Sequence, residues 1–376
     1  LALFSRLFPI HNLQIPLFAD PALQGMITKL MLIHQGIPDT WNPFLPIAFQ
    51  HQPGFAGIVA WFSLFSSVPI PQIILFLTNI VHALFPFSLY LLAYSLSKNR
   101  VASAVAATLG LIAIFPTSLF VAGANATVLM YPLSIVAAGS AILFLRESAT
   151  HVQRAVSGFS IYRNTFLFFG VLFAGSILIH PTFVVFFSLI LGPYVVFLFL
   201  TRKKKFFRKY GLQLSCIALA AIAAGSLAAP FFLHSMPNEN LLKEQWGIQA
   251  GYMNPEHRLS PYFFLEPVFF LFDNPQGAWY LYLENFSLQE LLGRPVGLLM
   301  TSLFLYSLFF LWKKKDGLGY FFLALYLIFL ALSWVQSVVR IEFPLWTVLY
   351  PTRIKFLMVL PVALLISLPF FRRPLP

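Results

Sequence analysis

Charged residues are scarce in this chain, and this scarcity excludes an ordinary soluble fold. Asp, Glu, Lys and Arg make up 10% of its 376 residues, whereas hydrophobic residues make up 59% and the mean hydropathy is +0.81. Typical soluble domains are about 25% charged. The apolar runs repeatedly approach 20 residues, the length that crosses about 30 Å of hydrocarbon, whereas a transmembrane barrel would show short alternating segments. The composition therefore predicts a membrane protein built of helices.

Cysteine and the common nucleotide motifs are also lacking. The single cysteine, Cys216, lies within an apolar run, so a disulfide within the chain is excluded. The sequence contains no Walker loop, no glycine-rich dinucleotide fingerprint, no Cys/His metal spacing and no serine nucleophile elbow. It also shows no internal repeat of the kind found in inverted-repeat transporters. These absences give no support to soluble-nucleotide chemistry.

The apolar runs define the fold prediction, an all-α polytopic transmembrane helical bundle of about nine to ten spans. The bundle forms a single integral membrane domain over residues 1–376. Residues 165–201 are too long for one span and divide at His180-Pro181, because proline disfavours helix at the preceding residue. The chain opens inside an apolar segment, so we expect a fragment that lacks most of its first transmembrane helix. The predicted spans are 71–96, 101–121, 126–146, 165–179, 182–201, 211–233, 295–312, 317–335 and 353–371, with a residual span at 1–10.

The basic residues orient this bundle. The net charge of +12 does not point to nucleic acid here, because the lysines and arginines lie in short loops between spans. In the nine-span arrangement, 16 of the 24 basic residues lie on one side, which the positive-inside rule assigns to the cytoplasm. Of the twelve acids, only Glu147 and Asp316 lie on that side. The sixteen are Lys98, Arg100, Arg146, Arg154, Arg163, Arg202, Lys203, Lys204, Lys205, Arg208, Lys209, Lys313, Lys314, Lys315, Arg372 and Arg373.

Three loops then lie on the outer side: 11–70, 234–294 and 336–352. In the first, residues 21–35 have the pattern of an amphipathic interfacial helix, and residues 55–68 are apolar but too short to span easily. Residues 261–272 of the second loop are also aromatic-rich and interfacial in character. The sequence thus predicts interfacial helices in the outer loops.

Asp20 is the leading candidate for chemistry on the outer side. A carboxylate there suits a general base, a metal ligand or a helix cap, and Asp before Pro-Ala is a good N-cap for a helix over 21–35. His51 closes the same loop before a Pro-Gly turn. His180 lies at the tip of the predicted hairpin, where histidine suits acid or base chemistry or a polar cap. The residues by themselves leave these alternatives open.

Three cations gather near the start of the last span: Arg340, Arg353 and Lys355. Cations at membrane depth are costly and usually face a cavity or an anion, and arginine suits bidentate contacts to phosphate. Snorkelling to lipid headgroups is the alternative. These residues are therefore candidates for binding a phosphate group.

Several short patches resemble a known family. They are Phe8-Pro9, Asp20-Pro21, Gly36-Ile37-Pro38, Gln52-Pro53-Gly54-Phe55, the stretch Leu89–Arg100, His180-Pro181-Thr182 and Pro351-Thr352-Arg353. Their order resembles the first outer loop and later helices of the GT-C superfamily of membrane glycosyltransferases, in its bacterial and archaeal members. The resemblance covers most of the chain in topology and these patches in residues.

The resemblance implies an activity and a site. The chain would move a sugar from a polyprenyl-phosphate donor to an acceptor (glycan, lipid or protein) on the non-cytoplasmic side of the membrane. Asp20 would match the first-loop acid, Arg353 with Arg340 or Lys355 would bind the donor phosphate, and His51 and His180 would line the cavity. Asp20 lacks the paired acid of many members, which weakens the case for a divalent metal ion without excluding one and leaves an inactive member open as an alternative. The resemblance implies the cytoplasmic membrane of a prokaryote.

Two other functions remain compatible with the sequence. A transporter or flippase would place charged or broken helices near the bilayer midplane, where this sequence offers His82 and the prolines at 116, 132 and 193. A non-catalytic membrane subunit, or a lipid-linked polymer ligase or polymerase, would share the large outer loops. The sequence identifies neither the sugar nor the acceptor.

Overall fold

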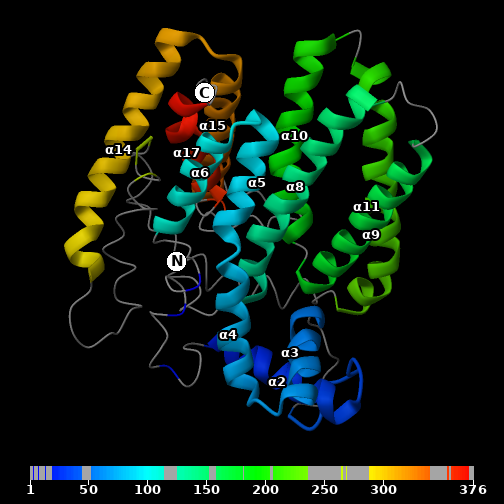
Figure 1. The fold of residues 1–376 in the computed structure, drawn as a ribbon. Coiled ribbons are helices and arrows are strands. Elements are labelled where there is room, and N and C mark those ends of the chain that lie inside the picture. Colours follow the sequence, from blue (N-terminus) through cyan, green and yellow to red (C-terminus); the bar gives the residue numbers. More distant parts are fainter. Residues whose placement is uncertain are drawn as a thin grey trace.

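The computed structural model describes most of the predicted bundle. It covers residues 19–44, 52–113, 125–151, 158–180, 182–203, 206–235, 288–338 and 357–371, with single positions at 3, 7, 13, 264, 265, 268 and 354. Across these residues the regular elements are helices and no strand is found, which confirms the all-α prediction (Figure 1). The elements are α2 (Ala19–His34), α3 (Gly54–Ser66), α4 (Ile70–His82), α5 (Phe85–Ser97), α6 (Arg100–Ile112), α8 (Asn125–His151), α9 (Gly158–Ile179), α10 (Thr182–Arg202), α11 (Phe206–Ser235), α14 (Leu288–Lys314), α15 (Gly317–Val338), α17 (Val359–Ser367) and η6 (Leu368–Phe370).

Six described stretches are long and apolar enough to cross a membrane, and each coincides with a predicted span. Three other predicted spans meet shorter apolar helices, at Arg100–Ile112, Gly317–Ser333 and Val359–Phe370. The residual span at 1–10 falls almost entirely outside the described residues. By length and composition, the chain is a multi-pass membrane protein. The six stretches are Ile70–Ser97, Leu129–Glu147, Ser160–Ile179, Thr182–Arg202, Phe206–Pro230 and Val296–Lys314.

The bundle surface fits a lipid environment. Val171 of α9 is 75% exposed and Leu227 of α11 is 70% exposed, and many other large apolar side chains share this outward position. Continuous apolar surface on this scale is unfavourable in water, whereas hydrocarbon solvates it without cost. The exposed faces therefore support the membrane class independently of helix length.

The predicted span 71–96 differs from a continuous helix. It divides into α4 and α5, which are separated by a turn at Ala83-Leu84 (Figure 1). Pro86 stands in the first turn of α5 and has no N–H to donate to the carbonyl four residues earlier, and its ring crowds the preceding turn. The predicted span is therefore one crossing stretch, Ile70–Ser97, with a local turn between α4 and α5 at which Ala83 and Leu84 keep right-handed helical dihedral angles.

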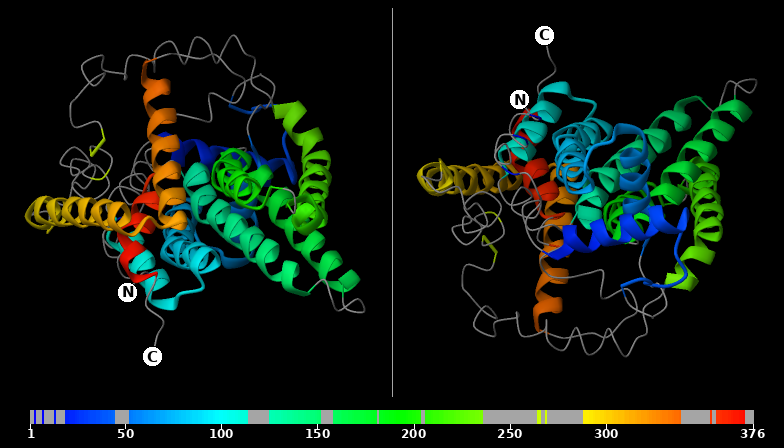
Figure 2. Two further views of the ribbon diagram at one scale, coloured as in Figure 1. Left: turned by 90° about the horizontal axis from the view of Figure 1, so that it is seen from above. Right: turned by 90° about the horizontal axis from the view of Figure 1, so that it is seen from below.

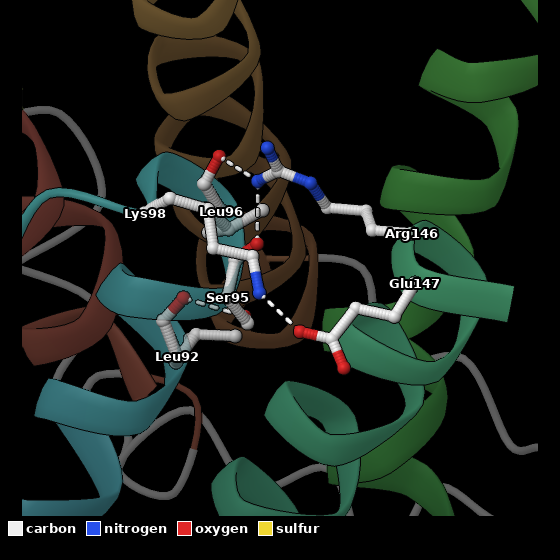
Figure 3. Close-up of polar contacts among 6 residues, drawn as sticks. All are labelled: Leu92, Ser95, Leu96, Lys98, Arg146 and Glu147. Atoms are coloured by element: carbon white, nitrogen blue, oxygen red, sulfur yellow. Dashed lines mark hydrogen bonds and ion pairs between the residues drawn. The ribbon is translucent and has the colours of Figure 1, made fainter. Parts of the chain in front are cut away.

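One end of the bundle, here called the basic end, is fastened by charged side chains. The C-terminal ends of α5, α8, α10 and α14 lie at this end (Figure 1). The Arg146 Nη1 atom of α8 donates to the carbonyls of Ser95 and Leu96 at 2.6 and 2.5 Å, and Lys98 pairs with Glu147 (Figure 3). Arg146 thereby satisfies carbonyls in the last turn of α5 that have no partner within the helix.

Asn99 joins two other elements at the basic end. Its Oδ1 atom accepts hydrogen bonds from the N–H groups of Val101 and Ala102, which makes Asn99 the N-cap of α6. Its Nδ2 group donates to the carbonyls of Phe370 and Phe371 at 2.8 and 3.2 Å. One amide side chain therefore starts α6 and holds the end of the described chain against it.

The opposite end, here called the α2–α3 end, is closed by helices that do not follow the bundle axis. Seen along the bundle, α2 lies lengthwise across this end (Figure 2). It packs against α3 and α4, and its buried Ile27 side chain clusters with Ala56 of α3. At the exposed surface of α3, Trp61 is 57% exposed and Phe65 is 74% exposed. Apolar and aromatic residues in a short helix at a bundle end fit the predicted interfacial position.

Candidate functional site

The α2–α3 end brings together two patches of the family resemblance that are far apart in the sequence. Gly54, the first residue of α3, packs so closely on the last turn of α9 that a Cβ atom there would lie 2.5 Å from the carbonyl carbon and oxygen of Leu178. No L side chain fits at this distance. The Gln52–Phe55 turn and the α9–α10 turn at His180 are therefore neighbours, which the sequence pattern does not reveal.

His180 occupies the hairpin tip, as predicted, between α9 and α10. The backbone N–H of Thr182 donates to its Nδ1 atom at 3.2 Å, and the Thr182 hydroxyl oxygen lies 2.5 Å from the same atom. Because a backbone N–H can only donate, Nδ1 is the acceptor and the ring proton is assigned to Nε2. This contact is the one expected of a polar cap on the turn, and the Nε2–H tautomer is the assignment that satisfies it.

Helix α2 is attached to α3 by a polar contact within an apolar interface. The Thr28 hydroxyl lies 2.7 Å from the carbonyl of Gln24 and 3.4 Å from the carbonyl of Ala56, and Thr28 is fully buried. Gly25 faces Ile70 and Ile74 of α4 at ordinary packing distance. These contacts fix α2, and with it the backbone of Asp20, relative to the start of α3.

Asp20 lies in the first turn of α2 rather than before it. The helix begins at Ala19, so Asp20 is the second residue of the helix and not its N-cap as predicted. The predicted site residues His51, Arg340, Arg353 and Lys355 lie outside the described residues, so their roles stay predictions.

The α4–α5 break contains polar residues that the site prediction left aside. Asn79 and His82 are 3% and 1% exposed, near the middle of the Ile70–Ser97 stretch. The Asn79 side chain donates to the carbonyl of Leu75 at 2.7 Å, and the His82 ring lies 5.6 Å from the ring of Phe85. The signal was present in the sequence as Asn and His in an otherwise apolar run.

No metal centre can be assembled from the described part of the chain. Among those residues, no group of three or more His, Cys, Asp or Glu side chains could hold an ion. The predicted site also contributes a single carboxylate, whereas hard divalent cations usually take several oxygen ligands.

The sequence was also compared with known proteins. It matches no protein-family model, and no curated protein is significantly similar to it. The class that fold and composition define is thus an all-α, multi-pass membrane bundle with a helical cap at one end.

Proposed function

We propose that the α2–α3 end is the site of a membrane glycosyltransferase of the GT-C type, acting on a polyprenyl-phosphate-linked sugar. The observation that carries the proposal is the contact between Gly54 and Leu178, which places the Gln52–Phe55 patch against the His180 patch. A family resemblance made of scattered short patches gains weight when two of them, about 125 residues apart, adjoin in space.

The distribution of charge supports the same end of the bundle. The arginine and lysine contacts of α5 and α8 gather at the basic end, opposite to α2 and α3. The positive-inside rule then assigns the α2–α3 end to the outer side, where polyprenyl-phosphate donors are used. That this membrane is the cytoplasmic membrane of a prokaryote is part of the proposal and follows from the family resemblance alone.

In the proposed reaction, the Asp20 carboxylate removes the proton from an acceptor hydroxyl. The acceptor oxygen forms a bond to the anomeric carbon of the sugar while the bond between that carbon and the phosphate oxygen breaks. The polyprenyl phosphate leaves with the electron pair, and Arg353 with Arg340 or Lys355 stabilises its charge. A carboxylate base needs hydrogen-bond reach to the hydroxyl, and the cations act by electrostatic stabilisation.

His180 would act as a positioning residue in this site. Its Nδ1 atom accepts a hydrogen bond from the Thr182 N–H. The ring therefore cannot take the proton of the acceptor hydroxyl at Nδ1 without losing that hydrogen bond. The Nε2–H group suits donation to a sugar or phosphate oxygen instead. His51 would line the same cavity.

The test is a transfer assay in membranes that contain the full chain and labelled polyprenyl-phosphate sugars. Asp20→Asn and Arg353→Ala are expected to lose transfer by at least about a hundredfold, because each removes a group that acts on the reacting atoms. The variants should insert and purify like the parent. The control is Asp39→Asn, an exposed acid of the same loop, which should retain full transfer. Unchanged transfer by Asp20→Asn would refute the proposal.

The α4–α5 break favours one alternative, a transporter or flippase. Discontinuous helices with buried polar residues near the midplane commonly form transport sites. In that case His82→Phe would abolish movement of a labelled lipid-linked substrate across reconstituted vesicles, whereas Asp20→Asn would leave it unchanged. The transferase proposal expects no such movement by the parent protein.

A further inference from the structure

A groove runs along one face of α6 at the basic half of the bundle. It has a volume of about 470 Å³ and is lined by α6 residues from Arg100 to Ile112 together with Met300 of α14. The lining positions on α6 recur every three or four residues, so they form a single stripe of the helix. Both α6 and α14 pack against α17. The groove therefore lies between two helices that share a neighbour.

The lining of this groove is almost entirely apolar. Leu109 and Met300 are 4% and 5% exposed, while Val101 and Ile112 are partly open at its two ends. The lining contains one hydroxyl group, that of Thr108, which donates back to the carbonyl of Ala104 at 2.9 Å. Since that hydroxyl is satisfied within the helix, the stripe below Arg100 offers hydrocarbon contacts alone.

The dimensions and the charge of the groove match one leaflet of a bilayer. Twelve residues separate Arg100 from Ile112, and at about 1.5 Å per residue the groove is about 18 Å long. One leaflet contributes about 15 Å of hydrocarbon. Arg100 begins α6 at the basic end. With that end at the membrane surface, we expect Arg100 to lie at the depth of the lipid phosphate groups. The guanidinium at one end of the groove can bind a lipid phosphate, and the apolar stripe that follows can contact the acyl chain. The groove therefore matches a phospholipid in the order of its two parts.

We propose that this groove binds one anionic phospholipid, with an acyl chain along α6 and the phosphate on Arg100. The site belongs to the leaflet at the basic end, so it is separate from the proposed transferase site and does not rest on it. Arginine binds phosphate through paired N–H donors, which a lipid phosphate diester can accept. A transmembrane segment of another protein would supply the hydrocarbon but would need an acid at the depth of Arg100.

The test is native mass spectrometry of the purified full chain, titrated with phosphatidylglycerol or with diacylglycerol of the same acyl chains. The parent is expected to retain phosphatidylglycerol and not diacylglycerol. Arg100→Gln should weaken this binding by at least about tenfold, because the charge-assisted hydrogen bonds from the guanidinium to the phosphate are lost. The matched control is Arg163→Gln, an exposed arginine of α9, which should leave the binding unchanged.

A second measurement locates the lipid. Phosphatidylglycerol carrying a photoactivatable acyl chain should crosslink to α6 or to Met300, and Ala104→Trp, which fills the groove, should abolish that crosslink. Equal weakening by Arg100→Gln and Arg163→Gln would overturn the proposal. Absence of the lipid crosslink would also overturn the proposal. So would crosslinking of a probe at position 104 to another segment of this chain, because the groove would then be filled by the protein itself.

Discussion

At position 54 the chain has no room for a side chain. The turn of α9 at Leu178 approaches Gly54 so closely that any Cβ atom would displace one of the two backbones. We expect Gly54→Ala to destabilise the protein by about 1–3 kcal/mol, the usual cost of overpacking. Thermal unfolding in detergent, followed by intrinsic fluorescence, would measure the loss. If the proposed function is correct, transfer activity should fall as well.

Gly175 is the matched control for this substitution. It lies in α9 itself, and a Cβ atom there would meet nothing within 4 Å. Gly175→Ala should be neutral or should stabilise the helix by up to about 1 kcal/mol, since alanine is the better helix former. Equal stability of both variants would show that the α3–α9 contact is not close.

The end of α5 depends on Arg146 of α8, which donates to the carbonyls of Ser95 and Leu96. This cation also lies at the negative end of the α5 dipole. Arg146→Met keeps the aliphatic stem but leaves both carbonyls without this donor, and we expect a loss of about 2–3 kcal/mol. The measurement is the midpoint of thermal unfolding in detergent, and Arg146→Lys should restore part of it.

The neighbouring ion pair provides the comparison for Arg146. Lys98 and Glu147 are 33% and 60% exposed at their side chains, so their charges remain solvated (Figure 3). Exposed ion pairs are worth about 0–1 kcal/mol. Glu147→Gln should therefore have a small effect, and high salt should reduce it further. If Glu147→Gln lowered the stability as much as Arg146→Met, the Lys98–Glu147 pair and not Arg146 would be the main contact that stabilises the junction of α5 and α8.

For the whole molecule, the two ends of the bundle should face opposite sides of the membrane. Because Cys216 is the single cysteine, Cys216→Ser gives a background without thiols. In that background, Lys29→Cys on α2 should react with a membrane-impermeant maleimide in intact cells. Lys203→Cys and Lys315→Cys should react only after the cells are permeabilised. Labelling of all three positions in intact cells would contradict the orientation on which the proposed function depends.

The sequence could predict the class of the fold and the places of the helices. Apolar runs near 20 residues are stable in hydrocarbon rather than in water. In hydrocarbon a segment must pair its own backbone N–H and C=O groups, and a helix does so within the segment. The hairpin at His180-Pro181 followed from the backbone chemistry of proline. The break at Ala83-Leu84 was less visible, because hydropathy averages over the run and does not register one missing N–H group at Pro86.

The sequence by itself therefore determined that this chain is an all-α membrane bundle. Each segment's own residues decide whether it prefers hydrocarbon to water and whether it can form its backbone hydrogen bonds as a helix. Only the tertiary structure decided which turns adjoin. The contact of Gly54 with Leu178, the two carbonyls bound by Arg146 and the groove below Arg100 each join segments whose spacing in the sequence carries no information about their distance. Packing between helices determines those neighbours, and it depends on the shapes of whole faces rather than on any local pattern.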